Sequence, residues 1–304
     1  MNPTTDRPHS SPTSPRRVAV LGLGPMGAAI ARSLRTAGHD VVVWNRSPKD
    51  LGEIGLADAP LTADPAGAVR DADAVIVCVR DHHASRELLE RLAPGLTAGV
   101  PVVNVSTGTP EDAVASADAA AALGIAYVTG AIMVPTALVG TEHHLVLCAG
   151  GQDAVAAARP VLAGLGGVTD VLGEDHAVPP ALDLAMLDVF FAGMYAFLHS
   201  AALVRAHGIE PSAYLPYATG ILETLGAELP NLAQAFELRK YDRGQASLEM
   251  CLRGLEHVVA ATEAAGVAPA LPRLVRDVTR AQMERAKPGV DWESVAEGLT
   301  DPAR

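Results

Sequence analysis

Short apolar runs of strand length alternate with longer stretches of helical spacing over the first half of the chain. The first run, 17–22 (RVAVLG), ends in glycine, a helical stretch follows at 26–37, and a second apolar run covers 40–44. A strand, a glycine loop, a helix and a second strand form a βαβ unit, which implies parallel strands. The alternation continues with apolar runs at 74–79, 100–105, 125–128 and 144–148 and with helical stretches at 84–92, 110–123 and 153–165.

The pattern changes after the pair Pro179-Pro180, where strand-like alternation stops and long helical stretches take over. Proline is tolerated in the first turn of a helix, so Pro180 can open the next one. We therefore expect an α/β domain over 16–178 and an all-α domain over 179–304. Residues 1–15 are polar and rich in Pro, Ser and Thr, which predicts a disordered tail, and they lack the apolar stretch of a signal peptide.

The segment 181–204 is apolar enough to resemble a membrane span. It carries Asp183, Asp188 and His199, each of which is costly in lipid. We expect no membrane association and interpret the segment as a helix buried in protein on nearly all sides.

Charge and cysteine content narrow the function classes. The 304 residues carry a net charge of −12, with 23 Lys+Arg against 35 Asp+Glu, and such a surface repels nucleic acid. The three cysteines are far apart and form neither a disulfide framework nor a metal pattern, which is typical of a reducing, cytoplasmic compartment. The pairs His82-His83 and His143-His144 lack metal spacing, so we expect no metal and place both pairs in loops or at strand edges.

The glycine loop after the first predicted strand reads Gly22-Leu23-Gly24-Pro25-Met26-Gly27, a GxGxxG motif that also opens a helix. In that context it predicts a dinucleotide site. Gly22 permits the tight turn, Gly24 lets the backbone approach the pyrophosphate, and Gly27 lets helix and strand pack closely. The helix N-terminus then faces the negative charge.

The end of the second predicted strand indicates which dinucleotide binds. An NAD site usually has Asp or Glu here to hold the ribose hydroxyls, but this strand is followed by Asn45, Arg46 and Ser47, with Lys49 close by. Arg46 can stack on adenine and pair with a 2′-phosphate, Ser47 can donate to it, and Lys49 adds charge. The cluster favours NADP(H) over a simple solvated loop. We assign further cofactor contacts to Cys78, Val79 and Asn104, and to Ser106 and Thr107, for which capping of the next helix is the alternative.

Several motifs together resemble one known group. GLGPMG followed by WNRS resembles the β-hydroxyacid dehydrogenase superfamily. Within it, the imine reductases are the closer match, through Asn104 to Pro110 (NVSTGTP), Gly130 to Pro135 (GAIMVP), the stretch ALDLAML from Ala181, and the later pairs Tyr241-Asp242 and Ser247-Leu248. The resemblance covers nearly the whole chain after residue 16.

The resemblance implies an α/β Rossmann N-terminal domain, a long interdomain helix and an all-α C-terminal domain that is exchanged between the two subunits of a homodimer. It implies NADPH-dependent reduction of a C=N bond to an amine, and it places Asp183 where hydroxyacid dehydrogenases carry a catalytic lysine. Many imine reductases have Tyr before this Asp, whereas this chain has Leu182.

The residues themselves bear on that assignment. The three lysines, Lys49, Lys240 and Lys287, lie far in sequence from 181–204, so no lysine there can assist oxidation of a hydroxyacid. Burial in an apolar helix should raise the pKa of Asp183, which could then donate a proton to an imine nitrogen or, if ionised, stabilise an iminium cation. The alternative is that Asp183 only caps or orients the helix.

Apolar residues complete the predicted site. Helical spacing puts Leu187, Phe190 and Met194 near the face of Asp183, and Ile132, Met133 and Val134 supply a wall suited to an apolar imine. Two alternatives to an imine reductase are an NADP-dependent hydroxyacid or aldehyde-type dehydrogenase of the same superfamily, and a catalytically idle NADP-binding protein.

Overall fold

In the computed structural model, residues 14–244 and 246–300 are described. The predicted tail at 1–15 therefore lies almost wholly outside the described residues. By contacts the chain divides into two compact units, Met1–Asp188 and Val189–Arg304. The sequence predicted domains over 16–178 and 179–304. The boundary between the two units lies ten residues later than that prediction, inside the continuous helix at Val178–Ala206.

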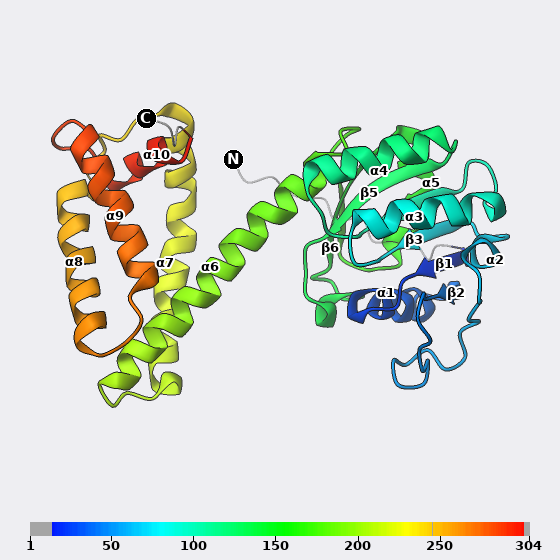
Figure 1. Ribbon diagram of the computed structural model, residues 1–304, viewed down its shortest axis with the longest axis horizontal. Helices are drawn as coiled ribbons and strands as arrows, with labels where there is room; N and C mark the ends of the chain where they lie inside the picture. Colours follow the sequence, from blue (N-terminus) through cyan, green and yellow to red (C-terminus); the bar gives the residue numbers. More distant parts are fainter. Residues whose placement is uncertain (1–13, 245, 301–304) are drawn as a thin grey trace. The chain divides into compact units, whose positions relative to one another are not determined.

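The first unit is built on one sheet of seven strands (Figure 1). Its order is β2-β1-β3-β4-β5-β6-β7, and every neighbouring pair is parallel except β5 and β6. The strands are β1 Arg17–Leu21, β2 Asp40–Trp44, β3 Ala74–Val77, β4 Pro101–Asn104, β5 Ala126–Ile132, β6 Leu145–Gly150 and β7 Val168–Val171.

Helices cover both faces of this sheet, which gives three layers and two separate cores. The helices are α1 Pro25–Thr36, α2 Pro65–Val69, α3 His82–Leu92, α4 Pro110–Ala122 and α5 Gln152–Ala163. Ile30 of α1 and Leu162 of α5 belong to the core on one face. Leu89 of α3 and Ala120 of α4 belong to the core on the other. Since strands β1 to β4 are parallel and covered on both faces, their apolar runs are continuous rather than alternating.

Three features of the sheet differ from the sequence expectation. Strand β6 runs antiparallel to β5, whereas the strand–helix alternation suggested parallel strands throughout. A short connection replaces a crossover helix between these two strands, with a single 3-10 turn at Thr136–Leu138, and a direct return of this kind reverses the strand. Neither β7 nor α2 was predicted. β7 lies at the edge of the sheet, is mostly exposed and carries no continuous apolar run, and α2 has only five residues, too few to show a helical period.

Helix α6, Val178–Ala206, continues from the first unit into the second. It begins at Val178, so Pro179 and Pro180 both lie in its first turn, where their missing N–H groups break no helical bond. By length and composition it is the one helix among the described residues that could cross a membrane.

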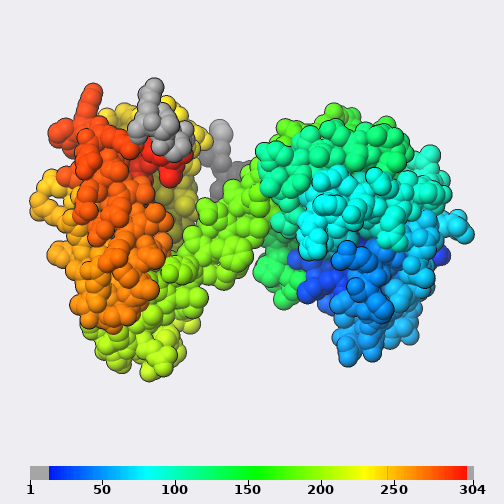
Figure 2. Space-filling view, in the orientation of Figure 1, coloured from blue at the N-terminus to red at the C-terminus, as the bar shows by residue number. Residues whose placement is uncertain are grey.

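The expectation that α6 is buried on nearly all sides is wrong for a single chain. Val189 is 71% exposed and Leu198 65% exposed; α6 is the green to yellow-green segment in Figure 2. The described residues of one chain leave these apolar side chains uncovered.

The second unit is helical, as expected. It contains α7 Pro211–Leu238, α8 Leu248–Ala264, α9 Ala270–Arg285, the 3-10 turn η3 Trp292–Ala296 and α10 Glu297–Thr300. Buried Asp291 accepts hydrogen bonds from the backbone of Gly244 at 2.8 Å and Ala246 at 3.3 Å, which ties the loop after α7 to the start of η3.

Candidate active site

The glycine loop joins β1 to α1 as the motif predicted. Gly22 has φ +102°, and a Cβ atom there would lie 2.1 Å from the carbonyl oxygen of Cys78. A Cβ on Gly27 would lie 2.0 Å from the carbonyl oxygen of Gly22. Both positions therefore need glycine, one for its backbone angle and both for space.

The N-terminus of α1 is arranged to receive an anion. Its N-cap residue, Gly24, makes no side-chain cap, and no acidic residue lies in the first turn. The helix N–H groups are thus left for a ligand, and the helix dipole favours negative charge there. Within the described residues nothing lies within 4 Å of the point where a Cβ on Gly24 would be. This open cradle fits the pyrophosphate of a dinucleotide.

A cleft of about 430 Å³ extends from this loop. Ten of the predicted cofactor residues line it, namely Gly22, Gly24, Pro25, Met26, Gly27, Asn45, Arg46, Ser47, Cys78 and Val79. Asn45 connects the glycine loop to the segment after β2. Its Oδ1 accepts the N–H of Leu23 at 2.9 Å, and its Nδ2 donates to the carbonyl of Ser47 at 2.7 Å. Burial raises the pKa of the Cys78 thiol to about 11, so it is protonated at neutral pH.

Five of the predicted cofactor residues do not line the cleft, namely Leu23, Lys49, Asn104, Ser106 and Thr107. The side chain of Leu23 is buried in the core, which its apolar character explains. Lys49 is exposed and lies outside the lining residues.

Three arginines line the cleft, and two of them lack a carboxylate partner. Arg80 pairs with Asp81 at 2.7 Å. Arg46 and Arg91 form no ion pair within residues 14–244 and 246–300, and the Arg91 guanidinium lies 5.3 Å from the ring centroid of Trp44. An unpaired cation facing a cleft in so acidic a chain is suited to an anionic ligand. Sequence reasoning missed Arg91 because it lies in the last turn of α3, far along the chain from the WNRS segment.

A second cavity of about 180 Å³ contains Asp183 and adjoins this cleft. Met26, Cys78, Val79 and Arg80 line both spaces. Ser106, Thr107, Gly130, Ile132 and Pro180 are among the residues that line the cavity with Asp183. All of these residues belong to the first unit.

Asp183 is 9% exposed, and burial raises the pKa of its carboxyl group, as predicted. The carboxyl makes no hydrogen bond to any described residue. It stands five residues after Val178, beyond the first turn of α6, so it does not cap that helix. A buried carboxyl group in a cavity, without a structural partner, is a candidate for chemistry.

The other predicted substrate residues are only partly brought to this cavity. Ile132 lines it, whereas Met133 and Val134 do not. Leu187, Phe190 and Met194 are also absent from its lining, and Phe190 and Met194 are 53% and 41% exposed. Helical spacing predicts which residues share a face of α6, but it carries no information on what covers that face.

Asn104 lies beneath the site rather than in it. Its Nδ2 donates to the hydroxyls of Tyr127 and Ser85, each at 2.8 Å, and its Oδ1 accepts the N–H of Ser106 at 3.1 Å. The hydroxyl of Ser106 in turn accepts the N–H of Val79 at 3.0 Å. Two loops that line the cavity are therefore held together from below.

Ser106 and Thr107 line the cavity and do not cap α4. That role belongs to Thr109, whose hydroxyl accepts the N–H of Asp112 at 3.2 Å in a reciprocal capping box. The capping alternative for Ser106 and Thr107 is therefore wrong.

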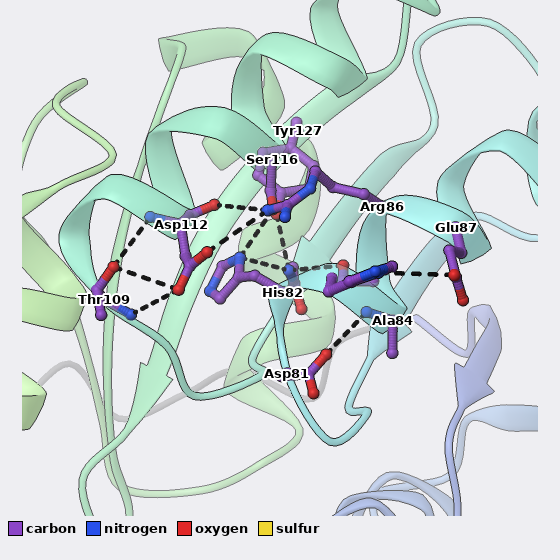
Figure 3. Close-up of polar contacts among 12 residues, drawn as sticks. Asp81, His82, Ala84, Arg86, Glu87, Thr109, Asp112, Ser116 and Tyr127 are labelled. Carbon is purple, nitrogen blue, oxygen red and sulfur yellow. Dashed lines mark hydrogen bonds and ion pairs between the residues drawn. The ribbon is translucent and has the colours of Figure 1, made fainter.

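His82 is not a loop or strand-edge residue, contrary to the expectation from the sequence. It is the first residue of α3, is 1% exposed and lines the cavity of Asp183. Figure 3 shows its polar contacts. His144 lies in the loop just before β6, as expected, and is also 1% exposed. Among the described residues, no three His, Cys, Asp or Glu side chains gather in a way that could hold a metal ion.

Comparisons with known proteins agree with this geometry. Residues 17–173 match the family described as NAD binding domain of 6-phosphogluconate dehydrogenase. Residues 175–301 match the family described as NADPH-dependent reductive aminase-like, C-terminal domain. A curated NADPH-dependent reductive aminase of Aspergillus oryzae is 26% identical over 82% of this chain and 85% of its own length.

Solved structures give the same result over almost the whole chain. An imine reductase from Pseudomonas sp. aligns with a TM-score of 0.88 and 27% identity over 94% of this chain and 100% of its own. A reductive aminase from Aspergillus terreus, in complex with NADPH4, cyclohexanone and allyl amine, aligns with a TM-score of 0.85 and 29% identity over the same shares, 94% and 100%.

Proposed function

The chain belongs to the imine reductase family of NADP(H)-dependent oxidoreductases, and on that premise we propose that it reduces a C=N bond to an amine with Asp183 as the acid. One observation carries the assignment of Asp183. Its buried carboxyl group lies in a cavity that shares the wall residues Met26, Cys78 and Val79 with the cleft of the glycine loop. A substrate in that cavity would be next to a dinucleotide in the cleft.

The chemistry needs two groups, a hydride and a proton. When bound, the dinucleotide supplies the hydride to the carbon of the C=N bond. Asp183 gives its proton to the nitrogen, and the carboxylate that forms is reprotonated from solvent. Burial raises the pKa of Asp183, which increases the share of the neutral acid that this role needs.

The hydroxyacid dehydrogenase alternative would need a lysine at the cavity. None of the three lysines lines the cleft or the cavity. The lining supplied by Gly130, Ala131 and Ile132 is apolar, which suits an imine better than a carboxylate.

We further propose that Arg46, Ser47 and Arg91 bind the 2′-phosphoadenosine half of NADP(H). Arg46 and Arg91 line the cleft without a carboxylate partner among the described residues, and Ser47 lines the same space. A phosphate would receive two charged donors here, and ion pairs of that kind are strong when geometry allows.

The direct experiment follows the absorbance of NADPH at 340 nm with a cyclic imine such as 2-methylpyrroline. The wild type should oxidise NADPH, and Asp183→Ala and Asp183→Asn should lose about 100-fold or more of kcat, the usual contribution of general acid catalysis.

NADPH affinity, measured by protein fluorescence quenching, is the control. Both variants should keep the wild-type Kd, because Asp183 does not line the cofactor cleft. Full activity in Asp183→Asn would contradict the role of Asp183, and a wild type that oxidises only hydroxyacids would contradict the reaction.

A further inference from the structure

His82, which lines the cavity of Asp183, belongs to a cluster of polar side chains. Figure 3 shows the contacts within this cluster. His82 begins α3, follows the N-cap residue Asp81, and is 1% exposed. Burying an imidazole is unfavourable unless its ring nitrogens are hydrogen-bonded, so its contacts indicate what it does there.

On its helix side, His82 is held by Ser116 of α4, whose hydroxyl lies 2.9 Å from Nδ1. Nδ2 of Asn104 lies 3.5 Å from the same nitrogen. The two N–H groups of that amide are directed to the hydroxyls of Ser85 and Tyr127 at 2.8 Å, so its contact with the ring is the weakest of the three.

The charged neighbours of the ring are Asp81 at the N-cap of α3, Arg86 of α3 and Asp112 of α4. Arg86 reaches the hydroxyl of Ser116 at 3.4 Å and the carboxylate of Asp112 at 3.8 Å. Burial is the largest effect and lowers the pKa of His82, so the ring is neutral at pH 7.

On its other side His82 supports the loop between β4 and α4. A hydrogen bond between the ring and the backbone of Ser106 raises the pKa of His82, against the larger effect of burial. A Cβ on Gly108 would lie 2.4 Å from Cδ2 of His82, so the loop backbone rests directly on the ring. Ser106, Thr107 and Gly108 line the cavity, and their positions therefore depend on the imidazole.

We propose that His82 is a positioning residue for hydride transfer, which fixes the Ser106–Gly108 wall of the cavity so that the substrate meets the cofactor at the right distance and angle. This inference rests on the proposed function. A displacement of about 1 Å in such a wall can reduce the rate of transfer as much as 100-fold with little change in binding.

The test uses the full-length protein with His82→Ala and His82→Gln. In His82→Ala, kcat for the imine should fall about tenfold or more, whereas the Kd of NADPH should stay within about threefold of wild type. Amide exchange of peptides covering 105–109 should accelerate, with exchange elsewhere in the first unit unchanged. His82→Gln keeps a neutral N–H donor of similar reach and should restore most of kcat.

Gly108→Ala tests the same contact from the loop side. Its new methyl group would collide with the His82 ring, so kcat should fall in the wild-type background. In the His82→Ala background the ring is gone, and the same substitution should cost much less, as expected for coupled residues.

A loss of thermal stability in His82→Ala with unchanged kcat and unchanged exchange at 105–109 would overturn the proposal, as would full additivity with Gly108→Ala. If the wild type reduces no C=N substrate, the proposed function fails separately. The exchange measurement and its reversal by His82→Gln then still decide whether the ring holds the loop.

Discussion

The carboxyl group of Asp183 is buried at a cost to stability. Its pKa is raised by burial above the ordinary value, so at pH values between the unfolded and folded pKa the folded state binds more protons than the unfolded state. The free energy of unfolding contributed by this group therefore falls as pH rises through that window and stays low above it.

The expected effect of removing the charge of Asp183 on stability is therefore opposite to the effect expected for a carboxylate that caps a helix. Asp183→Asn removes the charge, so its melting temperature should exceed that of wild type at pH 7 to 8, and the difference should vanish as the pH approaches about 4. The exposed Asp188→Asn on the same helix is the matched control and should show no such trend. A lower melting temperature for Asp183→Asn at pH 8 would indicate a structural role.

At Arg91, the prediction concerns cofactor choice. Arg91→Ala should weaken NADPH binding about tenfold or more and leave the Kd of NADH nearly unchanged, because the lost interaction is with the 2′-phosphate. Arg80→Ala is the control, since the charge of Arg80 is already paired with Asp81. Fluorescence titrations of both cofactors measure the four constants. If Arg91→Ala weakened the binding of NADPH and NADH equally, the assignment of Arg91 to the 2′-phosphate would be wrong.

Some residues of the site can be predicted from the sequence, and others cannot. The glycines, Arg46 and Asp183 stand in local patterns, which a single sequence displays directly. His82 and Arg91 carry no local pattern, because their meaning comes from neighbours on other elements, Ser116 and Gly108 for one and Trp44 for the other. Only tertiary structure brings these partners together.

The junction of β1 and α1 is the element on which cofactor binding depends. Gly24 and Gly27 lie in one motif but in different surroundings. A Cβ on Gly27 would collide with the backbone of Gly22, whereas among the described residues none is within reach of a Cβ on Gly24.

Alanine at Gly27 and alanine at Gly24 should therefore affect different properties of the protein. Gly27→Ala should lower the free energy of unfolding of the ligand-free protein by about 1–3 kcal/mol through overpacking. Gly24→Ala should leave that stability unchanged and raise the Kd of NADPH, because its methyl group occupies the space the pyrophosphate needs. Thermal melts without ligand and titrations with NADPH give both quantities. Equal destabilisation by the two variants would contradict the assignment of Gly24 to pyrophosphate binding.

Element prediction succeeded where runs were long and periodic. The strand at 40–44 and the helix at 110–123 agree closely with β2 and α4. The sequence did not reveal the antiparallel pairing of β5 with β6, because strand direction depends on the route of the connection rather than on composition. It predicted α6 but could not say whether one chain covers it.

At the scale of the whole molecule, many large apolar side chains of the helical unit are not covered by other described residues of the same chain. Val189, Phe191 and Leu198 of α6 and Tyr217 and Ile221 of α7 are all more than half exposed. Exposed apolar surface of this kind is typical of an obligate interface. We therefore propose the homodimer expected from the sequence, with a second copy covering these helices.

Sedimentation equilibrium should give about twice the chain mass of 31.3 kDa. Phe191→Asp combined with Leu198→Asp should shift the mass toward the monomer, since two charges would have to be buried. Leu61→Asp, at a 48% exposed apolar position of the first unit, is the control and should leave the mass unchanged. A wild type that sediments as a monomer at micromolar concentration would contradict the dimer.

The central claim, hydride transfer to the carbon of a C=N bond, is tested most directly with NADPH deuterated at C4 of the nicotinamide. Each of the two C4 isomers is supplied with 2-methylpyrroline, and the product is analysed by mass spectrometry and NMR. We predict that one isomer gives 2-methylpyrrolidine with a single deuterium on the former imine carbon, in equal amount to the NADP+ formed. NADP+ formation without deuterated amine from either isomer would contradict the account.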